Sequence, residues 1–157
     1  MLNKSGRVVV LGSNSFIAKN FIKLLKNNGI PNLGLTRAEC DFENPESINI
    51  LSNIIDDNDT IIFIAANAPV KNNEMFLSNI KISNNICASL SNKKFKHLIY
   101  ISSDAVYYDA KGLLNEMSFC QPASLHGSMH YSREVMIQSV IKSPICIIRP
   151  TLIYGIN

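Results

Sequence analysis

A short turn near the amino terminus has the residue types that a phosphate-binding loop needs. Gly12, Ser15 and Ala18 are spaced three apart, directly after the apolar stretch Val8 to Leu11. In a nucleotide-binding turn the first position lets the chain reverse tightly and the second lets backbone amides approach a pyrophosphate. The third lets the following helix sit close to the strand. Only one of the three is glycine, so the spacing indicates dinucleotide binding but leaves an ordinary strand–turn–helix open.

Strands and amphipathic helices must position this turn. Runs rich in β-branched residues predict strands at residues 7–12, 32–36, 60–65, 97–102 and 145–149. The helical period predicts helices over residues 15–28, 45–55, 72–91 and 127–141, with an irregular loop over 109–123. Asn44 and Pro45 are typical of a helix start, as the N-cap and the first helical residue.

This regular alternation of strand and helix predicts an α/β fold. Parallel strands need long crossover connections, and each connection here is long enough to hold a helix. No repeat, linker or low-complexity segment divides residues 1–157. We therefore expect one Rossmann-type domain: a doubly wound parallel sheet of about six strands with helices on both faces.

Composition and charge exclude several other classes of protein. The chain is 46% hydrophobic and 17% charged, which excludes a disordered or collagen-like chain. We expect a soluble, cytoplasmic protein with no membrane partner, since no apolar run approaches the roughly 20 residues that cross a bilayer and no secretory signal is evident. A net charge of +3 does not indicate a nucleic-acid partner. Four widely spaced cysteines do not indicate a metal site.

Five motifs together resemble the extended short-chain dehydrogenase/reductase family, the NAD(P)-dependent nucleotide-sugar epimerases, dehydratases and reductases. They follow the family's order and cover nearly the whole chain. The motifs are VLGSNSFIA at 10–18, CDF at 40–42, the Ala65-Ala66 pair with Asn79 downstream, ISSDAVY at 101–107 and RPTLIYG at 149–155. The resemblance implies a Rossmann-type fold, a nicotinamide dinucleotide cofactor and hydride transfer on a nucleotide-linked sugar.

The resemblance also implies which residues contact the cofactor. Asp41 would hydrogen-bond the adenine amine, although an aspartate there is also typical of a turn cap. Ala65 and Ala66 would line the ribose and pyrophosphate, or would only be small residues at a crowded strand end. The complete implied set is Gly12, Ser15, Phe16, Ile17, Ala18, Arg37, Asp41, Phe42, Ala65, Ala66, His130, Arg149 and Pro150.

The choice of dinucleotide depends on the end of the second strand. An acid there binds the ribose hydroxyls of NAD, whereas an arginine accommodates the 2′-phosphate of NADP. The chain continues from this strand with Thr36 and Arg37, and no acid precedes Glu39. We expect NADP, with the planar guanidinium of Arg37 on the phosphate, and NAD as the alternative; Arg37 could also be an ordinary solvated side chain.

Two candidate catalytic residues follow the fourth predicted strand. By the resemblance, Ser103 stands where the family carries the Ser or Thr that hydrogen-bonds the reacting oxygen. Asp104 stands where the dehydratases carry an acid, but Ala105 replaces their neighbouring glutamate and disfavours dehydration. Alternatively, the hydroxyl of Ser103 only caps backbone groups at the end of the strand.

The family's Tyr-x-x-x-Lys motif is replaced in this chain. Gly127 and Glu134 keep their relation to the motif, so His126 takes the place of the tyrosine and His130 that of the lysine. Because an imidazole titrates near neutrality, His126 can replace the general acid/base. One helical turn separates it from His130, so both can face the cofactor.

Two functional hypotheses follow from this replacement. In the first, the protein is an NAD(P)-dependent epimerase or reductase in which Ser103, Asp104, His126 and His130 form the catalytic site. In the second, hydride chemistry is lost and the domain binds or senses a dinucleotide without turnover. A shifted register with Tyr131 as the phenol is disfavoured, because Val135 would then stand where lysine belongs.

The resemblance extends to partners and length. Family members often dimerise through a helix pair, which suggests residues 72–91 and 127–141 as a homodimer interface. In relatives, a further strand and a C-terminal substrate-binding lobe follow the position of Asn157. We therefore expect residues 1–157 to be the cofactor-binding domain of a longer protein that binds a nucleotide sugar, or a truncated product of one. Without that lobe, catalysis by these residues alone is not expected.

Overall fold

The computed structural model describes residues 6–107 and 112–155. Its centre is an all-parallel sheet whose order across is β2-β1-β3-β4-β5. The strands are Val8–Leu11 (β1), Asn32–Leu35 (β2), Thr60–Phe63 (β3), His97–Ile101 (β4) and Ile145–Ile148 (β5). The predicted parallel α/β fold is confirmed. The chain passes from β1 to β2 on one side and then crosses to β3 on the other side of β1. The strand order therefore reverses beside β1, which is where ligands bind in such sheets.

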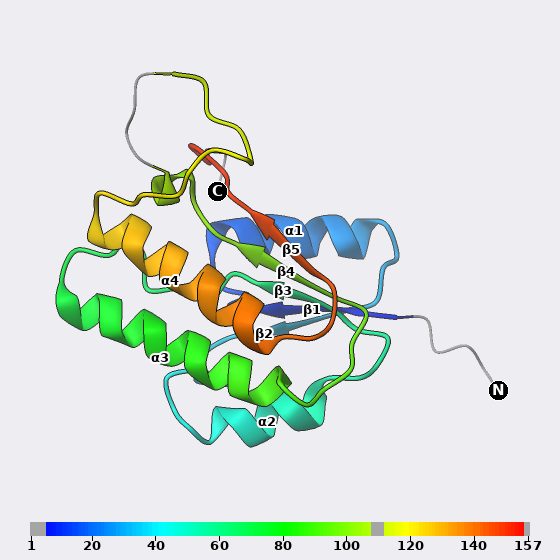
Figure 1. Ribbon diagram of the computed structural model, residues 1–157. Coiled ribbons are helices and arrows are strands. Elements are labelled where there is room, and N and C mark those ends of the chain that lie inside the picture. Colours follow the sequence, from blue (N-terminus) through cyan, green and yellow to red (C-terminus); the bar gives the residue numbers. More distant parts are fainter. Residues whose placement is uncertain (1–5, 108–111, 156–157) are drawn as a thin grey trace.

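Helices cover both faces of the sheet, as predicted, but unequally (Figure 1). Phe16–Asn27 (α1) lies on one face. The other face carries Ser47–Ile54 (α2), Asn73–Leu90 (α3) and Leu125–Val140 (α4). A 3₁₀ turn, Asp104–Val106 (η1), follows β4. None of the helices in the described residues is both long and apolar enough to span a bilayer.

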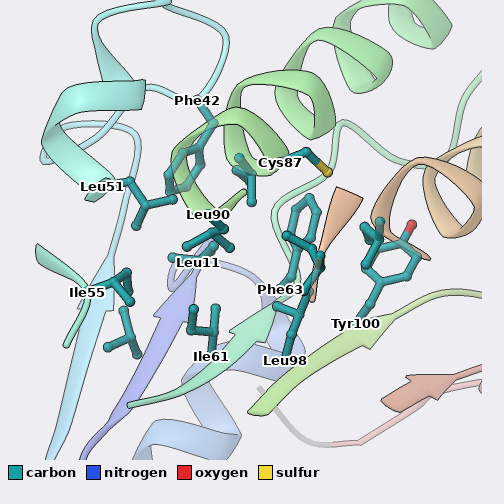
Figure 2. Packing of buried hydrophobic residues seen from close by; sticks show 14 of the residues in the cluster. Leu11, Phe42, Leu51, Ile55, Ile61, Phe63, Cys87, Leu90, Leu98 and Tyr100 are labelled. Atoms are coloured by element: carbon teal, nitrogen blue, oxygen red, sulfur yellow. The ribbon is translucent and has the colours of Figure 1, made fainter. Parts of the chain in front are cut away.

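The alternation of side chains along the strands explains why both faces are covered. Successive residues of a strand point to opposite faces, and the strands here are apolar on both. Figure 2 shows the larger cluster, in which strand residues Leu11, Ile61, Phe63, Leu98 and Tyr100 pack beneath α2, α3 and α4. The residues between them, such as Val10 and Ile62, pack against Ala18 of α1.

The expectation of about six strands is wrong for the described residues, which form five. After β2 the backbone bonds locally instead of along the sheet edge: the amide of Cys40 donates to the carbonyl of Thr36 at 3.0 Å. Asn44 donates in the same way to Asp41, at 2.9 Å. These turns occupy backbone amides and carbonyls that a further strand would need for pairing along the edge of the sheet.

Two predicted helix starts are also wrong. The second helix begins at Ser47 rather than Pro45, because the side chain of Asn44 accepts a hydrogen bond from Glu46 in a preceding turn and caps no helix. The last helix begins at Leu125 rather than at residue 127, because the hydroxyl of Ser124 caps it by accepting from the amide of Gly127.

Candidate functional site

Two adjoining cavities lie at the carboxyl ends of the strands. The outer cavity, of about 390 Å³, is lined by the turn after β1, the end of β2 and the segment after β3. The inner cavity, of about 620 Å³, extends from the start of α1 to Ser103, His126 and His130. Both are lined by Ser15, Ile64 and Ala66. Together they form one elongated crevice at the point where the strand order reverses.

The turn after β1 has the geometry of a phosphate-binding loop. Gly12 has φ +90°, and a Cβ atom there would lie 2.6 Å from the Cα of Ala65. Ser15 caps α1 by accepting from the amide of Ala18 at 3.2 Å, and Ala18 is completely buried. The first-turn amides of α1 have no carbonyl partner within the helix. The first-turn amides that the hydroxyl of Ser15 does not occupy can bind an anion, and the helix dipole adds to the attraction.

Arg37 and Asp41 both line the outer cavity and pair with each other. The Nε of Arg37 lies 3.6 Å from Oδ1 of Asp41, and its Nη2 lies 3.1 Å from Oε1 of Glu43. The side chain of Arg37 is 68% exposed, so it can turn toward a ligand, but a phosphate must compete with two carboxylates. Asp41 also accepts from the amide of Glu43 at 3.1 Å, which is the turn-capping role left open by the sequence.

A third carboxylate lies at the end of β2. Glu39 accepts a hydrogen bond from the amide of Thr36 at 2.8 Å and another from its hydroxyl. The hydroxyl bond is the main cause that lowers the pKa of Glu39. Thr36 lines the outer cavity. An ionised carboxylate thus lies beside the strand end that carries the ribose-binding acid in NAD-binding folds.

The inner cavity brings Ser103 together with both histidines. Gly127 makes this possible: a Cβ there would lie 2.0 Å from the carbonyl oxygen of Ala105, so α4 packs directly on η1. Ser103 accepts from the amide of Ala105 at 3.2 Å and donates to Asp104 at 3.2 Å. The hydroxyl therefore caps η1 while lining the cavity. Asp104 itself lines a neighbouring cavity.

The two imidazoles contact each other edge to face. Their ring centroids are 4.8 Å apart and the rings are nearly perpendicular, at 87°. Nδ1 of His126 accepts a hydrogen bond from the amide of Val70 at 3.4 Å. Burial lowers the pKa of His126, opposed by Asp104. A neutral imidazole that accepts at Nδ1 carries its proton on Nε2, so His126 is a hydrogen-bond donor toward any further partner.

His130 is held neutral more firmly. It is 6% exposed, and burial, followed by the charges of Arg133 and His126, lowers its pKa to about 3. Its Nδ1 lies 2.9 Å from the hydroxyl of Tyr100, and burial raises the pKa of that phenol to about 12. His130 thus lacks the fixed charge that a lysine would give.

Arg149 and Pro150 directly follow β5, but only the proline lies at the inner cavity. Pro150 lines the inner cavity. The guanidinium of Arg149 instead forms a bidentate pair with the buried carboxylate of Glu134, at 2.7 and 3.0 Å, and donates to the hydroxyl of Tyr107 at 2.7 Å. Ser102 donates to the same carboxylate at 2.5 Å. This network joins α4 to β4 and β5 beneath the inner cavity.

Sequence reasoning missed Arg133, which is 1% exposed and lies under the crevice. Its spacing was the available signal: it is four residues from Met129 and four from Ile137, both completely buried, so it had to lie on the buried face of α4. Tyr131, the phenol of the disfavoured register, lies on the exposed face with Val135.

The family model for the NAD dependent epimerase/dehydratase family matches residues 8–157. The chain belongs to this family. No curated protein sequence matches this epimerase/dehydratase family member.

Solved structures with the same fold include two epimerases and a reductase. UDP-N-acetylglucosamine 4-epimerase from Bacillus cereus has a TM-score of 0.84 at 21% identity, covering 98% of this chain and 63% of that one. dTDP-4-dehydrorhamnose reductase from Bacillus anthracis, in complex with NADP, has 0.79 at 22%, covering 98% and 57%. UDP-glucuronic acid 4-epimerase from Bacillus cereus, in complex with NAD, has 0.75 at 22%, covering 95% and 57%. The chain thus spans less than two thirds of each.

The two imidazoles should be neutral across the physiological pH range. We expect the Cε1–H resonance of His130 to stay fixed between about pH 8 and about pH 5, because its pKa lies near 3. The measurement is a ¹³C-edited NMR titration of the folded chain. The same chain in urea is the control, since its histidines should titrate near 6.5. A midpoint for His130 above about pH 5 in the folded chain would contradict the burial argument.

Proposed function

We propose that the chain is the cofactor-binding part of an NAD(P)-dependent oxidoreductase acting on a nucleotide-linked sugar. The main observation behind this proposal is the elongated crevice that joins the Gly12 turn to Ser103 and His126. Membership of the epimerase/dehydratase family supports the proposal. So do neighbours crystallised with NADP and with NAD, one a dTDP-sugar reductase and one a UDP-sugar epimerase.

The crevice fits an extended dinucleotide in both shape and chemistry. Ser15, Phe16 and Ile17 begin α1, whose amides suit a pyrophosphate. Asp41 and the backbone of Phe42 would hold the adenine half in the outer cavity. Ala65 and Ala66 leave room for the chain of phosphates and riboses, and Pro150 would flank the nicotinamide, whose ring accepts or supplies a hydride when bound.

Ser103 and His126 would handle the substrate oxygen. When a sugar hydroxyl is oxidised, the carbon loses a hydride to the dinucleotide and the oxygen loses a proton. Ser103 would hydrogen-bond that oxygen, and His126 would take the proton. Asp104 would stabilise the resulting imidazolium, since it already favours the charged form of His126. In the reduction of a ketone the same groups act in reverse.

One observation favours the second candidate, a binding domain without turnover. The amide of Val70 donates to Nδ1 of His126, so the acceptor nitrogen is occupied and Nε2 carries the proton. To take a proton at Nε2, His126 must first break this bond and move its own proton to Nδ1. In its present arrangement His126 can donate a hydrogen bond to a ligand oxygen without any such change.

The wider assembly stays a proposal. The helix pair 72–91 and 127–141, which corresponds to α3 and α4, would form a homodimer interface, supported by the exposed side chains of Leu77, Tyr131 and Val135. The nucleotide sugar would bind against a C-terminal lobe, supported by the neighbours being longer than this chain.

Dinucleotide binding should depend on Gly12. We expect Gly12→Ala to weaken NADPH binding about tenfold or more, because the new methyl group meets the backbone of Ala65. Gly29→Ala is the control: Gly29 also has positive φ, at +65°, but nothing lies within 4 Å of its added Cβ. Nicotinamide fluorescence measures both dissociation constants. Equal losses in the two variants, or no binding by the unchanged chain, would contradict the proposal.

Arg37 should distinguish the two dinucleotides. We expect NADPH to bind more tightly than NADH, and Arg37→Ala to remove that difference while leaving NADH binding unchanged. Glu43→Gln should strengthen NADPH binding, because it releases Arg37 from a competing carboxylate. Isothermal titration with both dinucleotides measures this. A preference of the unchanged chain for NADH would instead favour Glu39 as the ribose ligand.

The role of His126 can be tested directly. We expect His126→Ala to slow hydride transfer about 100-fold or more, with dinucleotide affinity preserved. The assay follows nicotinamide absorbance with UDP- and dTDP-linked hexoses and the corresponding ketosugars. His97→Ala, at the opposite end of the sheet, is the control. Tight dinucleotide binding without hydride transfer by the unchanged full-length protein would establish the second candidate, and an unaltered rate in His126→Ala would remove His126 from the mechanism.

A further inference from the structure

Arg133 is a buried cation that has no anionic partner among residues 6–107 and 112–155. Its guanidinium carbon lies 4.6 Å from the ring centroid of Phe63 and 5.2 Å from that of Tyr100, two residues that stand side by side in Figure 2. Among the described residues no carboxylate pairs with it. Burial of a charge is costly, and an apolar side chain of similar size is often as stable. Among the described residues, an ion pair therefore does not account for the arginine, and its other contacts must.

Its hydrogen bonds reach one segment of the crevice wall and the neighbouring helix α3. Nη2 donates to the carbonyl oxygen of Ala65 at 2.6 Å, Nε to the hydroxyl of Ser83 at 2.5 Å, and Nη1 to Oδ1 of Asn79 at 3.5 Å. Asn79 in turn accepts from the amide of Asn67 and donates to its carbonyl, both at 2.9 Å. Arg133 and Asn79 thus hold both ends of residues 65–67.

Apart from these bonds, this segment is held at its start by the amide of Ala65, which donates to the carbonyl of Leu11 at 2.8 Å. It belongs to the connection between β3 and α3, which contains no helix or strand from residue 64 to residue 72. It also forms the wall shared by the two cavities: Ala65, Ala66 and Asn67 line the outer one and Ala66 the inner one. Its backbone position therefore decides the width of the crevice beside Gly12.

Arg133 also supplies charge. His130, one helical turn away, is neutral, and the groups facing it are Arg133, His126 and Tyr100. An arginine guanidinium keeps its charge at every physiological pH. In a poorly hydrated interior such a charge acts over a longer range than at the surface. It lies directly behind the wall that an anionic ligand would contact.

We propose that Arg133 is a positioning residue of the dinucleotide crevice: its guanidinium holds residues 65–67 in place and gives the crevice a fixed positive charge that His130 does not supply. This inference rests on the proposed function for its ligand. The geometry itself belongs to the chain without ligand, so the two can be tested separately.

Three variants of the whole chain separate the roles of Arg133. Arg133→Met keeps the length of the side chain and removes both charge and hydrogen bonds. Arg133→Lys keeps the charge, but a single ammonium group cannot donate to both Ala65 and Ser83 as the guanidinium does. Leu24→Ala, at an exposed position of α1 on the other face of the sheet, is the control. Each is measured for NADPH affinity by nicotinamide fluorescence, for the Asn67 amide by ¹⁵N NMR and for the pKa of His130 by ¹³C NMR.

We expect Arg133→Met to weaken NADPH binding about tenfold, to move the Asn67 amide resonance and to raise the pKa of His130. Arg133→Lys should move the Asn67 amide but leave the pKa of His130 low, since charge and hydrogen bonds are then separated. Leu24→Ala should change none of these. Unaltered NADPH affinity together with an unmoved Asn67 amide in Arg133→Met would overturn the inference.

Two further outcomes are decided by the same data. If Arg133→Met does not fold, Arg133→Lys and Ser83→Ala carry the test, and an unmoved Asn67 amide in both overturns the inference. If the unchanged chain binds neither dinucleotide, the proposed function is wrong. The Asn67 amide then decides the positioning role alone: a shift in Arg133→Met supports it and no shift overturns it.

Discussion

The close approach of β1 and β3 at their carboxyl ends is the constraint on which the site depends. The two strands pair in parallel from Val8 with Thr60 to Leu11 with Phe63, and the chain beyond Phe63 passes within contact distance of Gly12. Only a residue without a side chain permits this approach, and the same residue turns the chain into α1. The turn, the start of α1 and the 65–67 wall are therefore fixed relative to one another by one contact.

A second layer of constraint comes from α4, which carries two buried charges of opposite sign. Glu134 is neutralised by Arg149 and hydrogen-bonded by Ser102, so its carboxylate anchors the helix to β4 and β5. Within the part of the chain that the structure describes, Arg133 contacts hydrogen-bond acceptors and aromatic faces but no carboxylate. The contacts of Glu134 fix the position of α4, and the hydrogen bond from Arg133 to Ala65 ties the crevice wall to this helix. Adjacent residues on one helix thus hold the two halves of the site.

The sequence predicted the parts of this structure that depend on local pattern. β-Branched runs became strands, and Ser15 caps the helix that was expected to follow the Gly12 turn. It mispredicted the start of α2, because whether Asn44 caps a helix or closes a turn depends on a difference in backbone angles that residue type does not determine. Local sequence pattern could not predict contacts between residues that are far apart in the chain. The bond from Val70 to His126 and that from Arg133 to Ala65 join residues brought together only by the sheet order.

The pair of histidines that stands in place of the family's tyrosine and lysine differs from that pair in charge as well as in residue type. Free imidazoles titrate near neutrality, yet burial lowers the pKa of both histidines. Asp104 opposes this shift at His126, whereas the charges of Arg133 and His126 add to it at His130. The cation that a lysine would provide at residue 130 is instead carried by residue 133, behind the wall rather than in it. In the proposed function, this charge attracts an anionic ligand while the neutral imidazoles offer hydrogen-bond donors. We therefore expect binding of a dinucleotide to depend less on a tyrosine and a lysine than hydride transfer does, so affinity and turnover must be measured separately in this chain.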